Sequence, residues 1–200
     1  RGFLIGGTAG RTTLSGEGLQ HQDGHGLMLA ANIPNCVSYD PTFAYEMAVI
    51  IHDGLRRMYK NQENIFYYLT AMNENYPQPA MPEGVEDCIL RGMYLFKAAP
   101  SYGKDELRVQ LLGSGTILRE AIAASSLLAE DFGVAADVWS VTSFTELRRQ
   151  GLEVQRWNLL HPDKEPRVCY VTDCLTDHKG PVIAATDYVK IYADQIRFGV

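Results

Sequence analysis

The sequence predicts an α/β fold with a mostly parallel sheet, because short apolar runs typical of buried strands alternate with segments of helical periodicity. The plainest unit is a strand at 107–112, a tight Gly-Ser-Gly turn and an amphipathic helix at 116–132. Gly133 then provides a helix stop, and residues 135–141 form the next strand. Strands that alternate with helices favour parallel pairing through right-handed crossovers.

The first eighty residues predict a smaller group of elements that precedes this unit. We expect strands at 3–5, 37–39 and 65–70 and a helical turn at 27–31. Asp40-Pro41-Thr42 is a helix-start signal, since proline is tolerated in the first turn and an acid suits the helix dipole. Apolar residues at helical spacing extend that helix to about Tyr59.

Three prolines within six positions, Pro77, Pro79 and Pro82, forbid a regular element and place the end of the first domain near residue 80. Residues 81–106 form a connecting region, with a helix at 83–94, a strand at 95–99 and a polar stretch at 101–106. Residues 107–200 form the second domain. Within it we expect a helix capped by Ser143 and Glu146, strands at 167–171 and 182–185, and a final helix from Asp187.

Composition excludes several classes of protein. Among 200 residues, 46% are hydrophobic and 21% charged, which is ordinary for a globular chain. The net charge of −6 argues against a nucleic-acid partner, which requires a clustered basic surface. No apolar run is long enough to span a membrane. The chain begins without a methionine and stops just after a helical pattern, so we expect it to be an internal segment of a longer protein.

The four cysteines, Cys36, Cys88, Cys169 and Cys174, lack the spacing of a metal or redox motif. They are most simply interpreted as buried thiols in a reducing compartment. The Gly113-Ser114-Gly115 turn also lacks dinucleotide chemistry, because Leu118 stands where the third glycine is required.

Residues 10–26 form the segment with the strongest signal for chemistry. They include five glycines, two histidines and two acids, and they show neither helical nor strand periodicity. Glycines allow positive φ and close backbone approach, so such a loop can present side chains to a small ligand. An ordinary glycine-rich connection has the same composition, and the residues alone leave both interpretations open.

Three runs of sequence resemble the homodimeric bacterial pyruvate dehydrogenase, a thiamine-dependent member of the transketolase superfamily. They are GFLIGGTAGRTTLSGEGLQHQDGH from Gly2, IPNCVSYDPTFAYEMAVIIHDGLRRMY from Ile33 and LTAMNENYPQPAMPEG from Leu69. The similarity continues to the end of the chain. It implies the end of a transketolase-type pyrimidine-binding domain, followed by an incomplete transketolase C-terminal-like domain.

The resemblance implies two catalytic residues in the glycine-rich loop. His21 would face pyruvate at the reacting carbon, as a hydrogen-bond donor or proton shuttle. Glu17 would support it, since a nearby carboxylate raises the pKa of an imidazole and fixes its tautomer. Asp23 and His25 are weaker candidates, and His25 could equally hold the loop closed.

The implied reaction is the thiamine diphosphate-dependent oxidative decarboxylation of pyruvate, with transfer of the acetyl group to the lipoyl group of a partner acetyltransferase. The ligands of thiamine diphosphate and Mg²⁺ are expected outside this segment, so no cofactor or metal ligand is assigned within it. A cytoplasmic bacterial homodimer is expected. Two alternatives remain: a non-catalytic structural or dimerisation fragment, and another enzyme of the transketolase superfamily. The lack of Lys or Arg in the loop after Arg11 disfavours a sugar-phosphate substrate.

Overall fold

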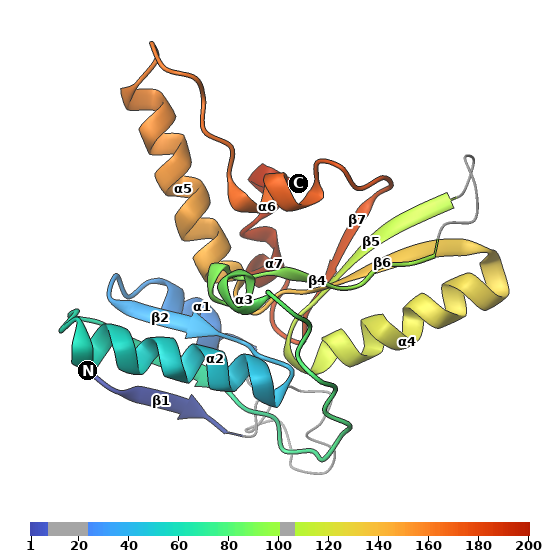
Figure 1. Ribbon diagram of the computed structural model, residues 1–200, viewed down its shortest axis with the longest axis horizontal. Coiled ribbons are helices and arrows are strands. Elements are labelled where there is room, and N and C mark those ends of the chain that lie inside the picture. Colours follow the sequence, from blue (N-terminus) through green and yellow to red (C-terminus); the bar gives the residue numbers. More distant parts are fainter. Residues whose placement is uncertain (8–23, 101–106) are drawn as a thin grey trace.

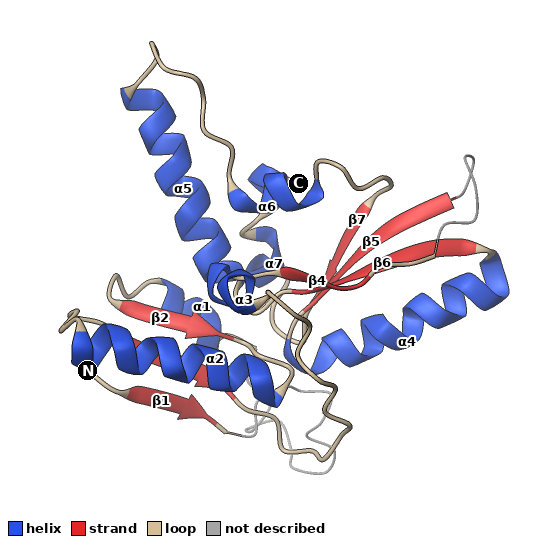
Figure 2. Cartoon of the chain, viewed as in Figure 1, coloured by secondary structure: helices blue, strands red, loops and turns tan. Residues whose placement is uncertain are grey.

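The chain forms two β-sheets with helices packed around them (Figures 1 and 2). The structure, a computed structural model, describes residues 1–7, 24–100 and 107–200. Within these ranges, one sheet has three strands in the order β1-β3-β2, and the other has four in the order β4-β6-β5-β7. The architecture is therefore α/β, as predicted from the alternation of strands and helices.

The first sheet is fully parallel and consists of β1 (Phe3–Gly6), β3 (Phe66–Thr70) and β2 (Cys36–Tyr39). The helix α2 (Ala44–Leu55), extended by a π-helical segment (Arg56–Lys60), packs on one face around the buried Ile50, Met58 and Tyr67. The short helix α1 (Gly26–Ala31) follows the segment 8–23 and lies beside β2. All the elements expected in this half are confirmed, although α2 begins a few residues after Pro41.

The second sheet is parallel except at one edge. The strands β5 (Leu107–Gly113), β6 (Val134–Ser140) and β7 (Val182–Ala185) run parallel, whereas β4 (Tyr94–Lys97) pairs antiparallel with β6. The sheet is thus mostly parallel, as expected. Helices α4 (Gly115–Phe132) and α5 (Phe144–Leu160) follow β5 and β6. Gly133 ends α4 at φ 62°, and the Ser143 hydroxyl accepts from the Glu146 amide (3.0 Å) to cap α5.

Successive residues of β5 point to opposite faces of the sheet and pack in two different hydrophobic cores, so both faces of this sheet are covered. Leu111 packs with Leu118 of α4, whereas Leu112 packs with Phe144 of α5. The core around Leu112 and Phe144 also contains residues of α6 (Tyr170–Leu175) and α7 (Ile191–Asp194). A 3₁₀ turn (Arg197–Gly199) follows α7. Figure 1 shows α4 on one side of the sheet and α6 and α7 on the other.

The prediction of a strand at 167–171 is wrong, because the chain forms the helix α6 from Tyr170. In the sequence, the apolar and aromatic residues at 168–171 resemble a buried strand. Tyr170 and Val171 are consecutive and both buried, because the start of α6 packs against the core. The Gln150 side chain accepts a hydrogen bond from the Tyr170 amide (2.9 Å).

Two predicted helices are shorter than expected. The helix α3 (Glu86–Arg91) ends where Gly92 adopts φ 111°, and Tyr94 then belongs to β4. The final helix begins at Ile191 instead of Asp187, because the Val189 amide donates to the Gly24 carbonyl (3.0 Å) rather than within a helix.

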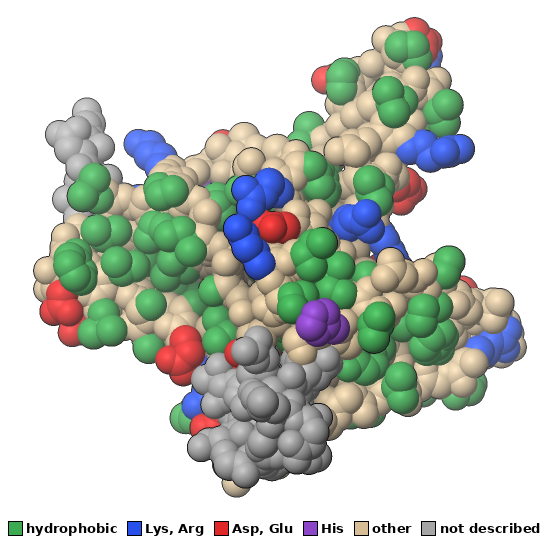
Figure 3. All heavy atoms as spheres, turned by 180° about the vertical axis from the view of Figure 1, so that it is seen from behind, with side chains coloured by type: hydrophobic (Ala, Val, Ile, Leu, Met, Phe, Trp, Pro, Cys, Tyr) green, Lys and Arg blue, Asp and Glu red, His purple; other side chains and the backbone are tan. Residues whose placement is uncertain are grey.

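Large hydrophobic side chains remain exposed on both halves of the molecule, as the rear view in Figure 3 shows. They include Leu107 and Ile183 on the second sheet and Phe132 at the end of α4. Within the described ranges, no helix is both long and apolar enough to cross a membrane.

Replacing Gly115 with alanine should destabilise the fold more than the same change at Gly133. Both glycines have positive φ (49° and 62°), but a Cβ at Gly115 would lie 2.5 Å from the Asp40 carboxylate, whereas one at Gly133 meets nothing within 4 Å. We expect Gly133→Ala to cost about 1–2 kcal/mol and Gly115→Ala about 2–5 kcal/mol. Urea unfolding of the two variants measures the difference; equal losses would contradict the close approach.

Candidate functional site

The carboxyl ends of the parallel strands in the two sheets converge on one buried region. Asp40 follows β2, Thr70 ends β3 and Ser114 follows β5, while Ser140 ends β6 and leads to Thr142. Together with Glu46 of α2, these residues form what we call the polar junction. Ligands of α/β proteins bind at the carboxyl ends of strands, so this is where the topology directs a search for chemistry.

Asp40 is at the centre of the junction and joins the two sheets. Its carboxylate accepts hydrogen bonds from the hydroxyls of Thr70 (2.6 Å) and Ser114 (2.8 Å). Its backbone amide donates to the Thr142 carbonyl (2.8 Å), and its carbonyl accepts from the Gly115 amide (3.1 Å). Burial raises the pKa of Asp40 to about 6, against the opposing effect of the two hydroxyl donors. The group therefore titrates closer to neutrality than an ordinary carboxyl.

Glu46 forms the second acidic centre of the junction. One oxygen accepts from the Thr42 and Phe43 amides (2.6 and 3.0 Å) at the start of α2. The other accepts from the hydroxyls of Ser140 and Tyr94 (2.6 Å each). Glu46 is fully buried, and burial raises its pKa despite these four donors. An acid of the first half is thus tied to both β4 and β6 of the second.

The segment that contains the predicted catalytic residues begins and ends beside this junction. Gly6 at the carboxyl end of β1 accepts from the Ala71 amide (3.0 Å), next to Thr70. At the other end, the Gly24 carbonyl binds the Val189 amide (3.0 Å), close to Tyr188 and Asp187. The charge of Asp187 contributes to the raised pKa of Asp40, which places Asp187 near the junction.

His21, Glu17 and Asp23 lie in residues 8–23, outside the described residues, so their assignment stays a prediction. His25 is described: it is exposed and precedes α1, where its carbonyl accepts from the Leu29 amide (3.0 Å). The described residues contain no group of three histidines, cysteines or acids that could hold a metal ion. They therefore do not fit an Mg²⁺ site.

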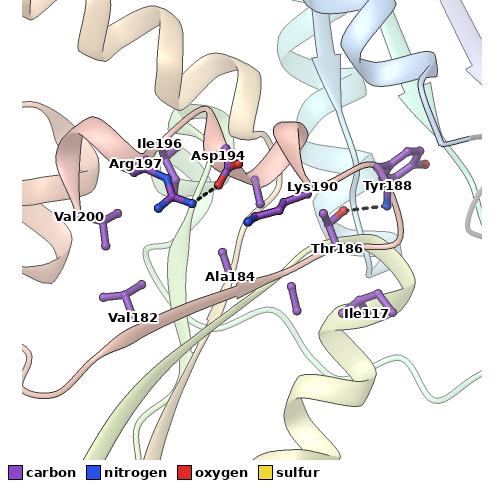
Figure 4. A pocket seen from close by; sticks show the side chains of 12 residues that line it. Ile117, Val182, Ala184, Thr186, Tyr188, Lys190, Asp194, Ile196, Arg197 and Val200 are labelled. Atoms are coloured by element: carbon purple, nitrogen blue, oxygen red, sulfur yellow. Dashed lines mark hydrogen bonds and ion pairs between the residues drawn. The ribbon is translucent and has the colours of Figure 1, made fainter.

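A pocket of about 650 Å³ lies next to the junction, between β7, the start of α4 and α7 (Figure 4). Thr186 lines this pocket and connects it to the junction, because the Ser114 hydroxyl lies 3.2 Å from the Thr186 hydroxyl. Lys190 and Arg197 add basic groups to a mostly apolar lining, and Arg197 pairs with Asp194 (2.5 Å). In Figure 4, Tyr188 lies at the Thr186 end of the pocket.

The Gly113-Ser114-Gly115 turn has a structural role in this arrangement. Gly113 allows the start of α4 to approach, since a Cβ there would lie 2.7 Å from the Leu118 Cα. Asp137, further along β6, is held by Arg108 (2.7 Å) and Gln110 (2.9 Å). Burial opposes its ionisation, but donors from Ala99, Gln110 and Arg108 hold the pKa of Asp137 below its usual range. These contacts stabilise the second sheet and are not directed at a ligand.

Sequence reasoning missed the junction, although it noted several of its residues. In the sequence, Asp40 indicates only a helix start and Ser114 only a turn. The available signal was that strands predicted to be parallel end in polar residues: Asp40, Thr70 and Ser114. The sequence does not show that the ends of strands from two different sheets lie together.

Replacing Asp40 with asparagine should change how stability depends on pH. The pKa of Asp40 is about 6 in the folded protein and 3.8 ordinarily, so the folded state holds the proton more tightly. The free energy of unfolding therefore falls as pH rises from about 4 to 6, by about 3 kcal/mol at ~1.4 kcal/mol per pKa unit. Asp40→Asn should lack this decline in urea unfolding at a series of pH values.

Asp194→Asn is the matched control for this experiment, because Asp194 is at the surface and Arg197 lowers its pKa. That variant should keep the decline between pH 4 and 6. An unchanged pH dependence in Asp40→Asn would show that Asp40 titrates in the ordinary range.

Comparison with known proteins assigns both halves of the chain. Residues 1–79 match the pyruvate dehydrogenase E1 component middle domain, and residues 92–199 match the transketolase-like TK C-terminal domain. Among solved structures, a transketolase from Campylobacter jejuni covers 98% of this chain at a TM-score of 0.60 and 17% identity, and the chain covers 25% of it. At that identity the likeness establishes the fold alone.

Several bacterial proteins named pyruvate dehydrogenase E1 component are much more similar in sequence. Those of Pseudomonas aeruginosa, Cupriavidus necator and Escherichia coli K12 are 63%, 60% and 57% identical over 98% of this chain. The chain spans 22% of the length of each. The match of residues 92–199 spans more than half of the chain, so the chain belongs to the family of the transketolase-like TK C-terminal domain, and it is similar over nearly its whole length to bacterial pyruvate dehydrogenase E1 components.

Proposed function

We propose that the longer protein containing this chain catalyses the oxidative decarboxylation of pyruvate and transfers the acetyl group to a lipoyl group of a partner acetyltransferase. The observation that carries the proposal is the 63% identity over 98% of the chain to a protein named pyruvate dehydrogenase E1 component. Similarity at this level extends across both halves of the chain, including the segment with His21.

In this proposal the chain contributes acid–base groups rather than cofactor ligands. Thiamine diphosphate, when bound, supplies an electron sink for decarboxylation. We assign its ligands and those of Mg²⁺ to other parts of the longer protein, as the resemblance to the transketolase superfamily implies. His21 donates a hydrogen bond or proton to pyruvate, and Glu17 orients the imidazole and raises its pKa.

Support for that placement comes from the described residues on either side of 8–23. Before this segment, Gly6 lies at the carboxyl end of β1, next to Thr70 of the polar junction; after it, Gly24 bonds to Val189, which follows β7 and Thr186 of the pocket. The proposed assembly is a bacterial cytoplasmic homodimer that works with the acetyltransferase of the complex. No nucleic-acid partner is proposed, in keeping with the net charge of −6.

His21→Ala in the full-length protein should lower the turnover of pyruvate about 10²–10⁴-fold, the usual contribution of a positioned acid or base. Reductive acetyl transfer should be affected most and thiamine diphosphate binding least, because His21 acts on the reacting carbon. Lipoyl acetylation, with pyruvate compared against sugar phosphates as substrates, and thiamine titration measure these effects.

His52→Ala is the control, since His52 is exposed on α2. It should retain full activity. Normal activity in His21→Ala would exclude the catalytic assignment, and a preference for sugar phosphates in the unmodified protein would exclude the pyruvate reaction.

Glu17→Gln should move the pH profile of turnover without abolishing activity. Removing a carboxylate beside an imidazole lowers the imidazole pKa, so the limb assigned to His21 should shift to lower pH by about one unit. Steady-state rates between pH 5 and 9 measure the shift. A uniform loss of rate at all pH values would instead indicate that Glu17 does not interact with His21.

A further inference from the structure

We propose that Cys88 and Cys174 form a dithiol site that small-molecule disulfides oxidise to an intramolecular disulfide, joining α3 to α6. The two residues are 86 positions apart in the sequence and come from opposite sides of the chain's midpoint. The site depends on how these two short helices meet. It is independent of the catalytic proposal above.

Contacts around Tyr170 show that α3 and α6 face each other. The Arg91 guanidinium, at the end of α3, lies 3.5 Å from the centre of the Tyr170 ring, at the start of α6. The Tyr170 hydroxyl donates to the Met93 carbonyl (2.9 Å), just after α3. Tyr170 therefore packs against the C-terminal end of α3 and the residues just after it.

Helical spacing brings both cysteines to this contact. Cys88 precedes Arg91 by three residues, and Cys174 follows Tyr170 by four, so each shares a helix face with a residue of the contact. Burial raises the pKa of both the Tyr170 hydroxyl and the Cys174 thiol; both thiols raise the pKa of Tyr170 further, and Cys88 raises that of Cys174 further, as neighbouring groups do. Cysteines from two different helices are thus placed on either side of Tyr170.

Partial exposure distinguishes this pair from the other two cysteines of the chain. All four are free thiols, but Cys36 and Cys169 are buried, whereas Cys88 and Cys174 are of intermediate exposure. A small disulfide can approach a partly exposed sulfur, and the neighbouring thiol then lies within reach to complete the exchange. The prediction of buried thiols is therefore met at Cys36 and Cys169 but not at Cys88 and Cys174.

The reaction consists of two thiol–disulfide exchanges. One protein thiolate attacks a sulfur of the small disulfide and expels one small thiolate, leaving a mixed disulfide. The second protein thiolate attacks the protein sulfur of that mixed disulfide and releases the other small thiol. Two protein thiols lose two hydrogens, and two electrons reduce the small disulfide to two thiols.

The surroundings of the pair set the pH range of this reaction. Burial raises the pKa of the Cys174 thiol above 9.0, and Cys88 and Asp173 add to this, whereas Tyr170 and Arg91 oppose it. Only a small fraction is thiolate at neutral pH. Attack by Cys174 on the small disulfide should therefore become about tenfold faster between pH 7 and pH 8.

The test is to expose the full-length protein, under native conditions, to oxidised glutathione and to map disulfides in its peptides by mass spectrometry. We expect a linked peptide pair containing Cys88 and Cys174. Cys88→Ser and Cys174→Ser should each trap a mixed disulfide with glutathione on the remaining thiol, because the resolving sulfur is absent. Cys36→Ser is the matched control and should still give the linked pair.

Other outcomes would overturn the proposal. Glutathione retained on both cysteines of the unmodified protein would show that the sulfurs do not reach each other. Linkage of either residue to another cysteine, or a Cys88–Cys174 link only after denaturation, would show that the folded structure does not form the site.

Discussion

The buried carboxylate of Asp40 is the interaction on which the arrangement of the two halves depends. It is bound by Thr70 of the first sheet and Ser114 of the second, so a single side chain joins both (2.6 and 2.8 Å). A buried carboxylate without donors is very unfavourable, which makes these two hydroxyls obligatory partners. The backbone of Asp40 also bonds to Thr142 and Gly115, so its position is fixed at four points.

Much of this fold was predictable, because its elements follow from local patterns. In the unit of β5, α4 and β6, the helix has an apolar face at regular helical spacing and a glycine at each of its ends. These signals all predict the same structure. Prediction failed at α6, where Val168 to Val171 resemble a strand in isolation. There the tertiary contact of Tyr170 with α3 and Gln150 decides the structure, and no local pattern contains that information.

The candidate site was predictable only in part, for a related reason. The loop with His21 has an unusual composition that can be seen in the sequence alone. Asp40 and Glu46 have no such signal, since an acid near a helix start is common and normally solvated. Their importance comes from burial between two sheets, which depends on residues 74 and 94 positions away, Ser114 for Asp40 and Ser140 for Glu46. Only the assembled fold distinguishes them from surface acids.

Three helices, α2, α4 and α5, begin within the polar junction, next to strands that end there. Each helix directs the positive end of its backbone dipole toward the junction. The backbone amides of Thr42 and Phe43 accordingly donate to the Glu46 carboxylate, and the Gly115 amide donates to the Asp40 backbone carbonyl. Peptide groups do not titrate, and they are not carried on a flexible side chain. The positive ends of these helix dipoles are therefore a permanent part of the main chain around the junction. Substitution of surface lysines or arginines would leave that field in place.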